Sequence, residues 1–164
     1  MQARIKNPAL SVPGALDGLR EFGMAAREAD IPATTFELVH LRASQINGCG
    51  VCVDIHSRAL QRLGAGAERI NMTAAWREAP YFTEPERAAL ALAEAATRLA
   101  DSPDAVSDAV WEEAARHYDE QQLAALVVSI AAINAFNRLN VVTRQPTGPW
   151  VQQIADQAVE AIAA

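Results

Sequence analysis

Residues 44–56 read SQINGCGVCVDIH, a stretch that carries both cysteines of the 164-residue chain, Cys49 and Cys52. The Asn-Gly pair just before Cys49 is a turn signal, so it predicts the end of one helix and the start of another at about Cys49. On that second helix, Cys49, Cys52 and His56 share one face within an arc of about 60°. The two sulfurs and the imidazole are therefore expected to form one patch.

This patch suits redox chemistry, because a thiolate is a nucleophile and a thiol is not. The start of the helix favours Cys49 as the thiolate, since unpaired backbone N–H groups and the helix dipole stabilise negative charge there. The imidazole of His56, four residues after Cys52, favours Cys52 instead. The spacing alone leaves both assignments open. A disulfide between the two cysteines is sterically reasonable at this separation.

Two other uses of the cysteines have to be weighed. Free cysteines are frequently small buried hydrophobic residues. Two cysteines and a histidine are also legitimate zinc ligands, but a fourth ligand is not evident, because His40 and His117 have no ligand-like spacing to the motif. We therefore favour redox use and expect no metal.

Composition and length predict a single domain over residues 1–164. Hydrophobic residues make up 51% of the chain and aromatic residues only 5%, so small and aliphatic side chains must form the core and the helices must pack closely. The net charge of −6 argues against a nucleic-acid surface.

The N-terminus is expected to lack a signal peptide, because Pro8, Pro13 and Asp17 interrupt every apolar run there. The longest uncharged run, residues 121–137, is too short and too polar for a membrane span. These features predict a cytoplasmic protein with no membrane contact. In that reducing compartment, a Cys-x-x-Cys pair is more often catalytic or redox-sensing than structural.

Helical spacing recurs along the chain and no segment alternates with period two for long, so the sequence predicts an all-α fold. Pro13 is expected in the first turn of the first helix, and a capping box from Thr83 to Glu86 predicts the start of a later one. The predicted helices cover about residues 13–29, 32–46, 49–64, 68–78, 83–100, 107–118, 119–140 and 150–163.

Residues 123–136 are apolar on nearly every face of their predicted helix, which requires burial all round. Such a helix lies either in the centre of the domain or partly against another subunit. Both readings stay open from the sequence, and for so small a chain an oligomer is the easier explanation.

The motif also resembles a known family. Glu37, followed by eleven residues, Cys49-Gly-Val-Cys52 and then His56, is similar to the signature of the AhpD-like alkyl hydroperoxidases in the carboxymuconolactone decarboxylase superfamily. The flanking residues 41–49 and the later residues 133–138 look like the same family. The resemblance covers roughly residues 30–140, the motif-bearing core.

This resemblance implies an AhpD-like helical domain of about seven to eight helices, assembly into homotrimers or homohexamers, and a dithiol peroxidase cycle. Cys52 would be the peroxidatic thiolate, Cys49 the proton donor and resolving thiol, and Glu37 with His56 the relay that deprotonates Cys52. Val51 stands where the best-matched family member has a histidine.

The implied substrate is a small peroxide, either an alkyl hydroperoxide or hydrogen peroxide. No bound cofactor is implied, since an external dithiol such as dihydrolipoamide, on a lipoyl-bearing protein, or thioredoxin would supply the electrons. Two alternatives remain. The superfamily contains decarboxylase-like lyases that use no paired cysteines, and the chain could also be a non-catalytic oligomeric redox sensor or scaffold.

Overall fold

The chain folds into helices only. The computed structural model describes residues 2–163, except the side chains of residues 158 and 161–163, and within this range it has nine α-helices and no strand. The helices are α1 (Pro8–Ser11), α2 (Ala15–Ala25), α3 (Ala33–Asn47), α4 (Gly50–Arg62), α5 (Ala67–Met72), α6 (Glu84–Thr97), α7 (Asp108–Ala115), α8 (Glu120–Thr143) and α9 (Val151–Ala163), with short 3-10 helices η1 (Ala26–Glu28) and η2 (Thr73–Glu78). The prediction of an all-α fold is confirmed, while that of one domain over residues 1–164 stays a prediction.

The N-terminal segment differs from its prediction. A short additional helix, α1, begins at Pro8, and the side chain of Asn7 caps it by accepting the Ala9 N–H. The next helix starts only after Gly14, which adopts the left-handed conformation at φ 78° that favours glycine. Pro13 therefore precedes α2, and its predicted place in the first turn is wrong. This extra helix explains why nine helices are found where seven to eight were expected.

Two other helix starts agree with the sequence. At α6, the Thr83 hydroxyl accepts the Glu86 N–H while the Glu86 carboxylate accepts the Thr83 N–H. At α8, Asp119 and Gln122 make the same reciprocal pair. Each pair satisfies two backbone donors that the first turn of a helix leaves free.

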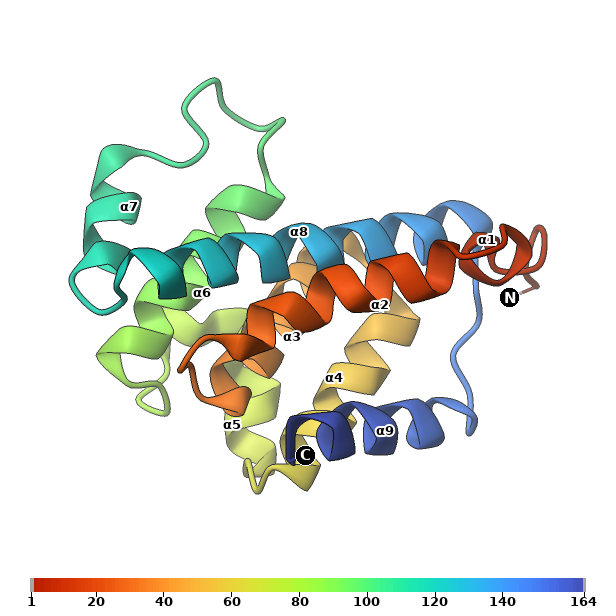
Figure 1. Cartoon of the computed structure of the whole chain (residues 1–164). Helices are drawn as coiled ribbons and strands as arrows, with labels where there is room; N and C mark the ends of the chain where they lie inside the picture. Colours follow the sequence, from red (N-terminus) through yellow and green to blue (C-terminus); the bar gives the residue numbers. More distant parts are fainter. Residues whose placement is uncertain (1, 164) are drawn as a thin grey trace.

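The long helix α8 forms the axis of the fold (Figure 1). Helices α2 and α3 both pack along it, and α3 also packs against α6 and α4. Helix α9 returns after α8 and lies against α4, below the level of α2 in Figure 1. Consequently α3, α4, α8 and α9 surround one region of the interior.

The core consists of three hydrophobic clusters. The first joins α3, α6 and α8 through residues such as Phe36, Leu92 and Leu126. The second lies between α3, α4, η2 and α6 and includes Leu60 and Leu90. The third surrounds the two cysteines and is completed by side chains from α3, α8 and α9. The cysteines are thus part of the packed interior.

Helix α8 is not buried on all sides within the single chain. Its interior face is buried, but Val127, Val141 and Val142 are exposed. By length and mean hydropathy α8 could cross a membrane. However, its buried Asn134 and Asn137 exchange hydrogen bonds with side chains of α3 and α6. Such paired polar groups identify α8 as the central core helix of this fold.

Candidate active site

The two cysteines lie where α3 ends and α4 begins. Gly48 terminates α3 with a left-handed φ of 68°, which reverses the chain, as the Asn-Gly signal predicts. Cys49 is the N-cap of α4, and its Sγ accepts the N–H of Cys52 at 3.3 Å. The two residues form a disulfide, with their Cα atoms 5.3 Å apart. The predicted pairing at this spacing is therefore present in the structure.

Both cysteines are enclosed. Cys49 is 1% exposed and Cys52 3%, so a substrate or reductant reaches them only if their cover moves. Ile133 of α8 and Val151 of α9 belong to the same cluster. Helix α9 therefore contributes directly to the cover.

Helix α9 and the loop before it are fastened to α4 by polar contacts at every fourth residue of α4. Asp54 accepts a hydrogen bond from Thr147. Arg58 Nη1 donates to Gln152 Oε1 at 2.6 Å, and Arg62 Nη1 pairs with Asp156 Oδ1 at 3.0 Å. These contacts are partly exposed, so each contributes little alone.

A carboxylate and a histidine form the second part of the site. Glu37, on α3, is fully buried, and its Oε2 lies 2.7 Å from His56 Nδ1 on α4. Its Oε1 accepts a hydrogen bond from Arg27 Nη2 at 2.5 Å. Burial alone raises the pKa of Glu37, but the proximity of His56, whose Nδ1 also hydrogen-bonds the carboxylate, opposes it most strongly. With smaller effects of His40 and Arg27, this holds the pKa of Glu37 well below its usual range.

The charge on Glu37 determines the tautomer of His56. An ionised carboxylate only accepts hydrogen bonds, so His56 Nδ1 must be the donor. In the neutral imidazole the proton is then on Nδ1, and Nε2 carries the lone pair. The arrangement thus prepares Nε2 of His56 to accept a proton from a neighbouring group.

His40 also belongs to this cluster, although its spacing to the cysteine motif does not indicate this. It lies one helical turn after Glu37 on α3, and its ring is 4.8 Å from that of His56. Its Nε2 is 2.7 Å from Ser129 Oγ, and its buried Nδ1 has no hydrogen-bond partner. Burial and the proximity of His56 lower the pKa of His40 well below its usual value, so it is neutral at pH 7. The spacing of three residues from Glu37 was the available signal.

One ligand atom each from Glu37, His40 and His56 lies within 4.8 Å of the others. These residue types can hold a divalent cation. The guanidinium of Arg27, however, already occupies Glu37 Oε1. A cation added here would face that positive charge, which disfavours metal binding. The expectation that the protein holds no metal stays a prediction.

The four predicted site residues thus form two contacting pairs. Cys49 is joined to Cys52, and Glu37 to His56. Within the part of the chain that the structure describes, no hydrogen bond connects His56 to either sulfur. Cys52 and His56 are four residues apart on α4, about 6 Å along the helix axis. The sulfur of Cys52 instead receives the side-chain N–H of Asn140 at 3.4 Å, a contact that the sequence analysis missed.

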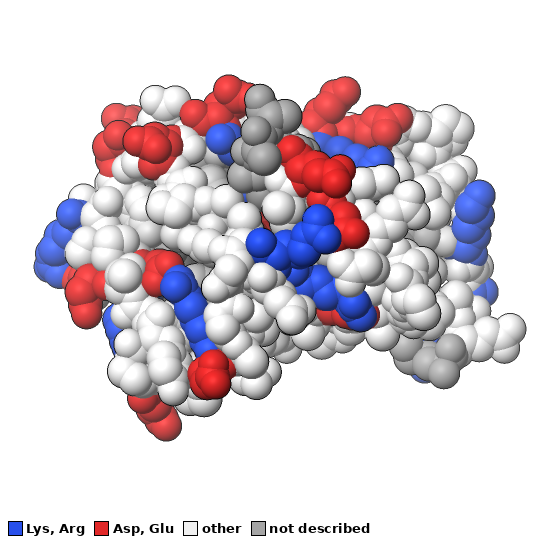
Figure 2. Space-filling model, turned by 90° about the horizontal axis from the view of Figure 1, so that it is seen from below, with Lys and Arg blue, Asp and Glu red and all other residues white. Residues whose placement is uncertain are grey.

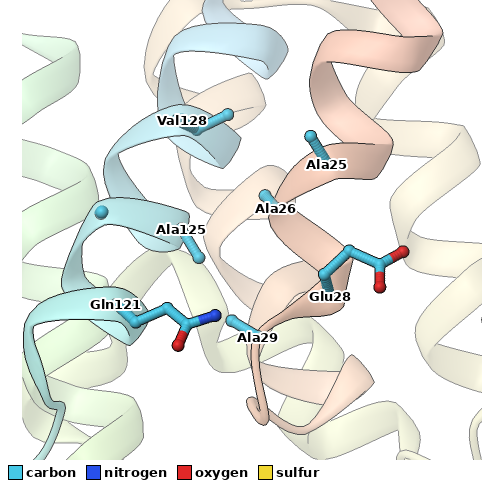
Figure 3. A pocket seen from close by; sticks show the side chains of 8 residues that line it. Ala25, Ala26, Glu28, Ala29, Gln121, Ala125 and Val128 are labelled. Atoms are coloured by element: carbon cyan, nitrogen blue, oxygen red, sulfur yellow. The ribbon is translucent and has the colours of Figure 1, made fainter.

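A shallow pocket lies elsewhere, between η1 and the beginning of α8 (Figure 3). Its volume is about 220 Å³, and its walls are mainly alanine side chains with Glu28, Gln121 and Val128. Ala125 in this pocket precedes Asn140 by fifteen residues, about 22 Å along α8. No thiol or imidazole lines the pocket, so it is separate from the cysteine site.

Charged side chains of both signs occupy the face seen from below (Figure 2). Lys and Arg side chains lie beside Asp and Glu side chains there, and this face has no extended basic patch. That agrees with the negative net charge. The absence of a nucleic-acid partner stays a prediction.

Comparison with known sequences identifies relatives of this chain. The sequence model of the carboxymuconolactone decarboxylase family matches residues 13–95. The uncharacterized protein YdfG of Bacillus subtilis is 36% identical over 115 residues, which cover 70% of this chain and 77% of YdfG. The alkyl hydroperoxide reductase AhpD of Bradyrhizobium diazoefficiens is 45% identical, but only over 40 residues, 24% of this chain and 22% of that protein.

Solved structures agree with the fold. ATU0492 from Agrobacterium tumefaciens, a protein of unknown function whose description associates it with AhpD antioxidant defence, has a TM-score of 0.83 and 32% identity, covering 90% of this chain and 99% of that one. The debrominase Bmp8 has a TM-score of 0.71 at 24% identity, covering 96% of this chain and 78% of its own. At that identity, Bmp8 supports the fold alone.

Proposed function

The chain belongs to the carboxymuconolactone decarboxylase family and is AhpD-like, and on this premise we propose that it is a thiol-dependent peroxidase. The proposed substrates are alkyl hydroperoxides or hydrogen peroxide. One observation carries the proposal: the Cys49–Cys52 disulfide lies on the same helix as His56, whose imidazole is held by the buried Glu37. The relatives named AhpD support antioxidant chemistry at the level of the family.

The cycle begins with the reduced dithiol. Nε2 of His56 accepts the proton of the Cys52 thiol, while ionised Glu37 holds the tautomer that makes Nε2 basic. For Nε2 to reach the thiol, the side chains have to come closer than in the disulfide form, or a water has to bridge them. Arg27 pairs with Glu37 and adds to the effect of His56 in keeping that carboxylate ionised, so it acts on the thiol through Glu37 and His56.

The Cys52 thiolate then attacks one oxygen of the peroxide. The O–O bond breaks, the alcohol leaves with a proton, and Cys52 becomes a sulfenic acid. Cys49 attacks this sulfur, so that water leaves and the disulfide forms. One peroxide and two thiols therefore give one alcohol, one water and one disulfide. An external dithiol restores both thiols and is itself oxidised to a disulfide.

We propose that the reductant is a lipoyl-bearing protein or a thioredoxin-like protein, that no bound cofactor takes part, and that the protein works in the cytoplasm. The enclosure of both cysteines means that the reductant has to displace part of the cover, to which α9 contributes. These partner assignments rest on the resemblance described above.

The test is peroxide consumption by the reduced protein, with dihydrolipoamide and, separately, with reduced thioredoxin. We expect turnover with at least one donor, and one equivalent of peroxide should remove two thiols and two hydrogens by mass. His56→Ala should slow the reaction about 10²-fold or more, in the range of positioned acid–base groups. His117→Ala, a histidine outside the site, serves as the matched control.

The outcomes separate the alternatives. Disulfide formation by peroxide without turnover would favour a redox sensor. No loss of thiols, or only sulfinic and sulfonic products, would exclude the dithiol cycle. In that case a cysteine-independent lyase, tested with Cys49→Ser/Cys52→Ser, becomes the better reading.

We further propose that the protein assembles into a homotrimer or homohexamer. The supporting observation is that apolar side chains remain exposed on adjacent α2 and α8: Phe22 and Met24 on α2, and Val127 on α8, are each more than 40% exposed. Exposed apolar surface of this kind commonly marks interfaces. Light scattering on the reduced protein tests this, and a monodisperse monomer at micromolar concentration would refute it.

A further inference from the structure

The sulfur of Cys52 faces a side-chain amide from the far end of the sequence. Asn140 Nδ2, near the C-terminal end of α8, lies 3.4 Å from Cys52 Sγ. Asn140 is 9% exposed and Cys52 3%, so little water competes for this contact. Because sulfur is a weak acceptor in a disulfide, the contact would become much stronger once Cys52 carries a negative charge.

The orientation of this amide follows from a backbone group. The N–H of Ala9 can only donate, and it donates to Asn7 Oδ1 at 2.9 Å. The other end of the Asn7 amide, Nδ2, then donates to Asn140 Oδ1 at 2.9 Å. With its oxygen engaged, Asn140 presents its Nδ2 to Cys52. The first turn of α1 thus sets the direction of a hydrogen bond at the disulfide.

The segment that carries Asn7 is itself fixed to the end of α8. The N–H of Arg4 donates to the carbonyl of Thr143 at 2.9 Å. Gln145 Nε2 donates to the carbonyl of Ile5, also at 2.9 Å. These contacts hold the N-terminal segment beside Asn140, so the Asn7 amide is prepositioned.

We propose that Asn140 is a thiolate-stabilising residue of the dithiol site and that Asn7 is the positioning residue that keeps the Asn140 amide in its donating orientation. The inference rests on the proposed function, because only a Cys52 that cycles through a thiolate uses this donor. When an external thiolate attacks Cys49, the Cys49–Cys52 bond breaks and its electron pair goes to Cys52 Sγ. The resulting thiolate forms directly in front of the Asn140 N–H, without reorganisation of the amide.

The two sulfurs therefore have donors of different kinds. Cys49 Sγ faces the backbone N–H of Cys52 at the start of α4. Cys52 Sγ faces a side chain. Only the second donor can be removed by substitution without altering the backbone, which makes the proposal testable at a single sulfur.

The experiment measures the acidity of Cys52 alone. The chain has two cysteines, so Cys49→Ser leaves Cys52 as the sole thiol. Its pKa is read from the ultraviolet absorbance of the thiolate against pH, with Cys49→Ser/Cys52→Ser as the blank. Adding Asn140→Ala should raise the pKa of Cys52 by about 1, the size expected for loss of one hydrogen bond to a charged group.

Asn7→Ser is the sharper variant. A serine hydroxyl can still cap α1 by accepting the Ala9 N–H, but it is too short to donate to Asn140. The substitution adds no charge, so a raised pKa of Cys52 would report the lost orientation of Asn140. Asn71→Ser, at an exposed position on α5, is the matched control and should leave the Cys52 pKa unchanged.

Each outcome decides a separate point. An unchanged Cys52 pKa in folded Asn140→Ala overturns the role of Asn140. If that variant does not fold, an unchanged pKa in Asn7→Ser overturns the proposal. If the pKa of Cys52 rises in Asn140→Ala but not in Asn7→Ser, Asn7 is not a positioning residue for Asn140. None of these readings needs peroxide turnover, so a failure of the proposed peroxidase activity is distinguishable from a failure of this inference.

Discussion

Replacing His40 by a neutral side chain should reduce the sensitivity of the fold to acid. His40 is buried beside His56, and Arg27 pairs with the neighbouring Glu37. Burial is the main reason that the pKa of His40 lies well below 6.5. The unfolded chain takes up a proton there at about pH 6.5, while the folded chain resists it. The free energy of unfolding is therefore highest above that pH and falls as the pH decreases below it.

The size of the effect follows from one proton. If the folded imidazole stays neutral, acidification from about pH 7 to about pH 5 lowers the free energy of unfolding by about 1.9 kcal/mol through this group. At about pH 5 the depressed pKa of Glu37 keeps that carboxyl ionised in the folded chain, so its own acid-sensitive range lies lower. Between about pH 7 and about pH 5, the change in the free energy of unfolding therefore reports His40 rather than Glu37.

Urea unfolding of the wild type, His40→Gln and His40→Asn at the two pH values measures this effect. Either substitution can change the stability at pH 7 through packing, but that change cancels in the difference between the two pH values. The wild type should lose about 1.9 kcal/mol more than either variant on acidification. Equal losses in all three proteins would show that His40 is not held neutral, and the reasoning from burial would be wrong.

Two further predictions concern stability. Glu37→Gln should lower the free energy of unfolding at pH 7 by about 3 kcal/mol, because it leaves the Arg27 guanidinium without its carboxylate. Since the pKa of Glu37 is depressed, this contribution is present above about pH 4.5 and is lost as the pH falls below it. The free energies of unfolding of the two proteins should therefore converge in acid. Leu90→Ala should cost about 3 kcal/mol in urea unfolding, since Leu90 is 0% exposed and its removal leaves a cavity; a loss below about 1 kcal/mol would indicate that the core collapses around the site.

Local signals in the sequence predicted several helix boundaries well. The turn at Asn47 and Gly48, the capping box at Thr83 and the start of a helix at Asp119 occur as expected, because each depends on hydrogen bonds between residues within a few positions. The same reasoning failed at Pro13, where the left-handed Gly14 delays α2. A proline at a helix start and a proline just before one look alike in sequence.

The sequence by itself determined the helical class, the joint between α3 and α4, and the proximity of Cys49 to Cys52, because all three follow from contacts a few residues apart. Only the tertiary structure decided which partners these groups meet. Arg27 and His40 gather around Glu37, and Asn140 reaches Cys52 across 88 residues of sequence. Such pairs depend on how α3, α4 and α8 pack, and helix periodicity specifies a buried face without specifying the residue opposite it.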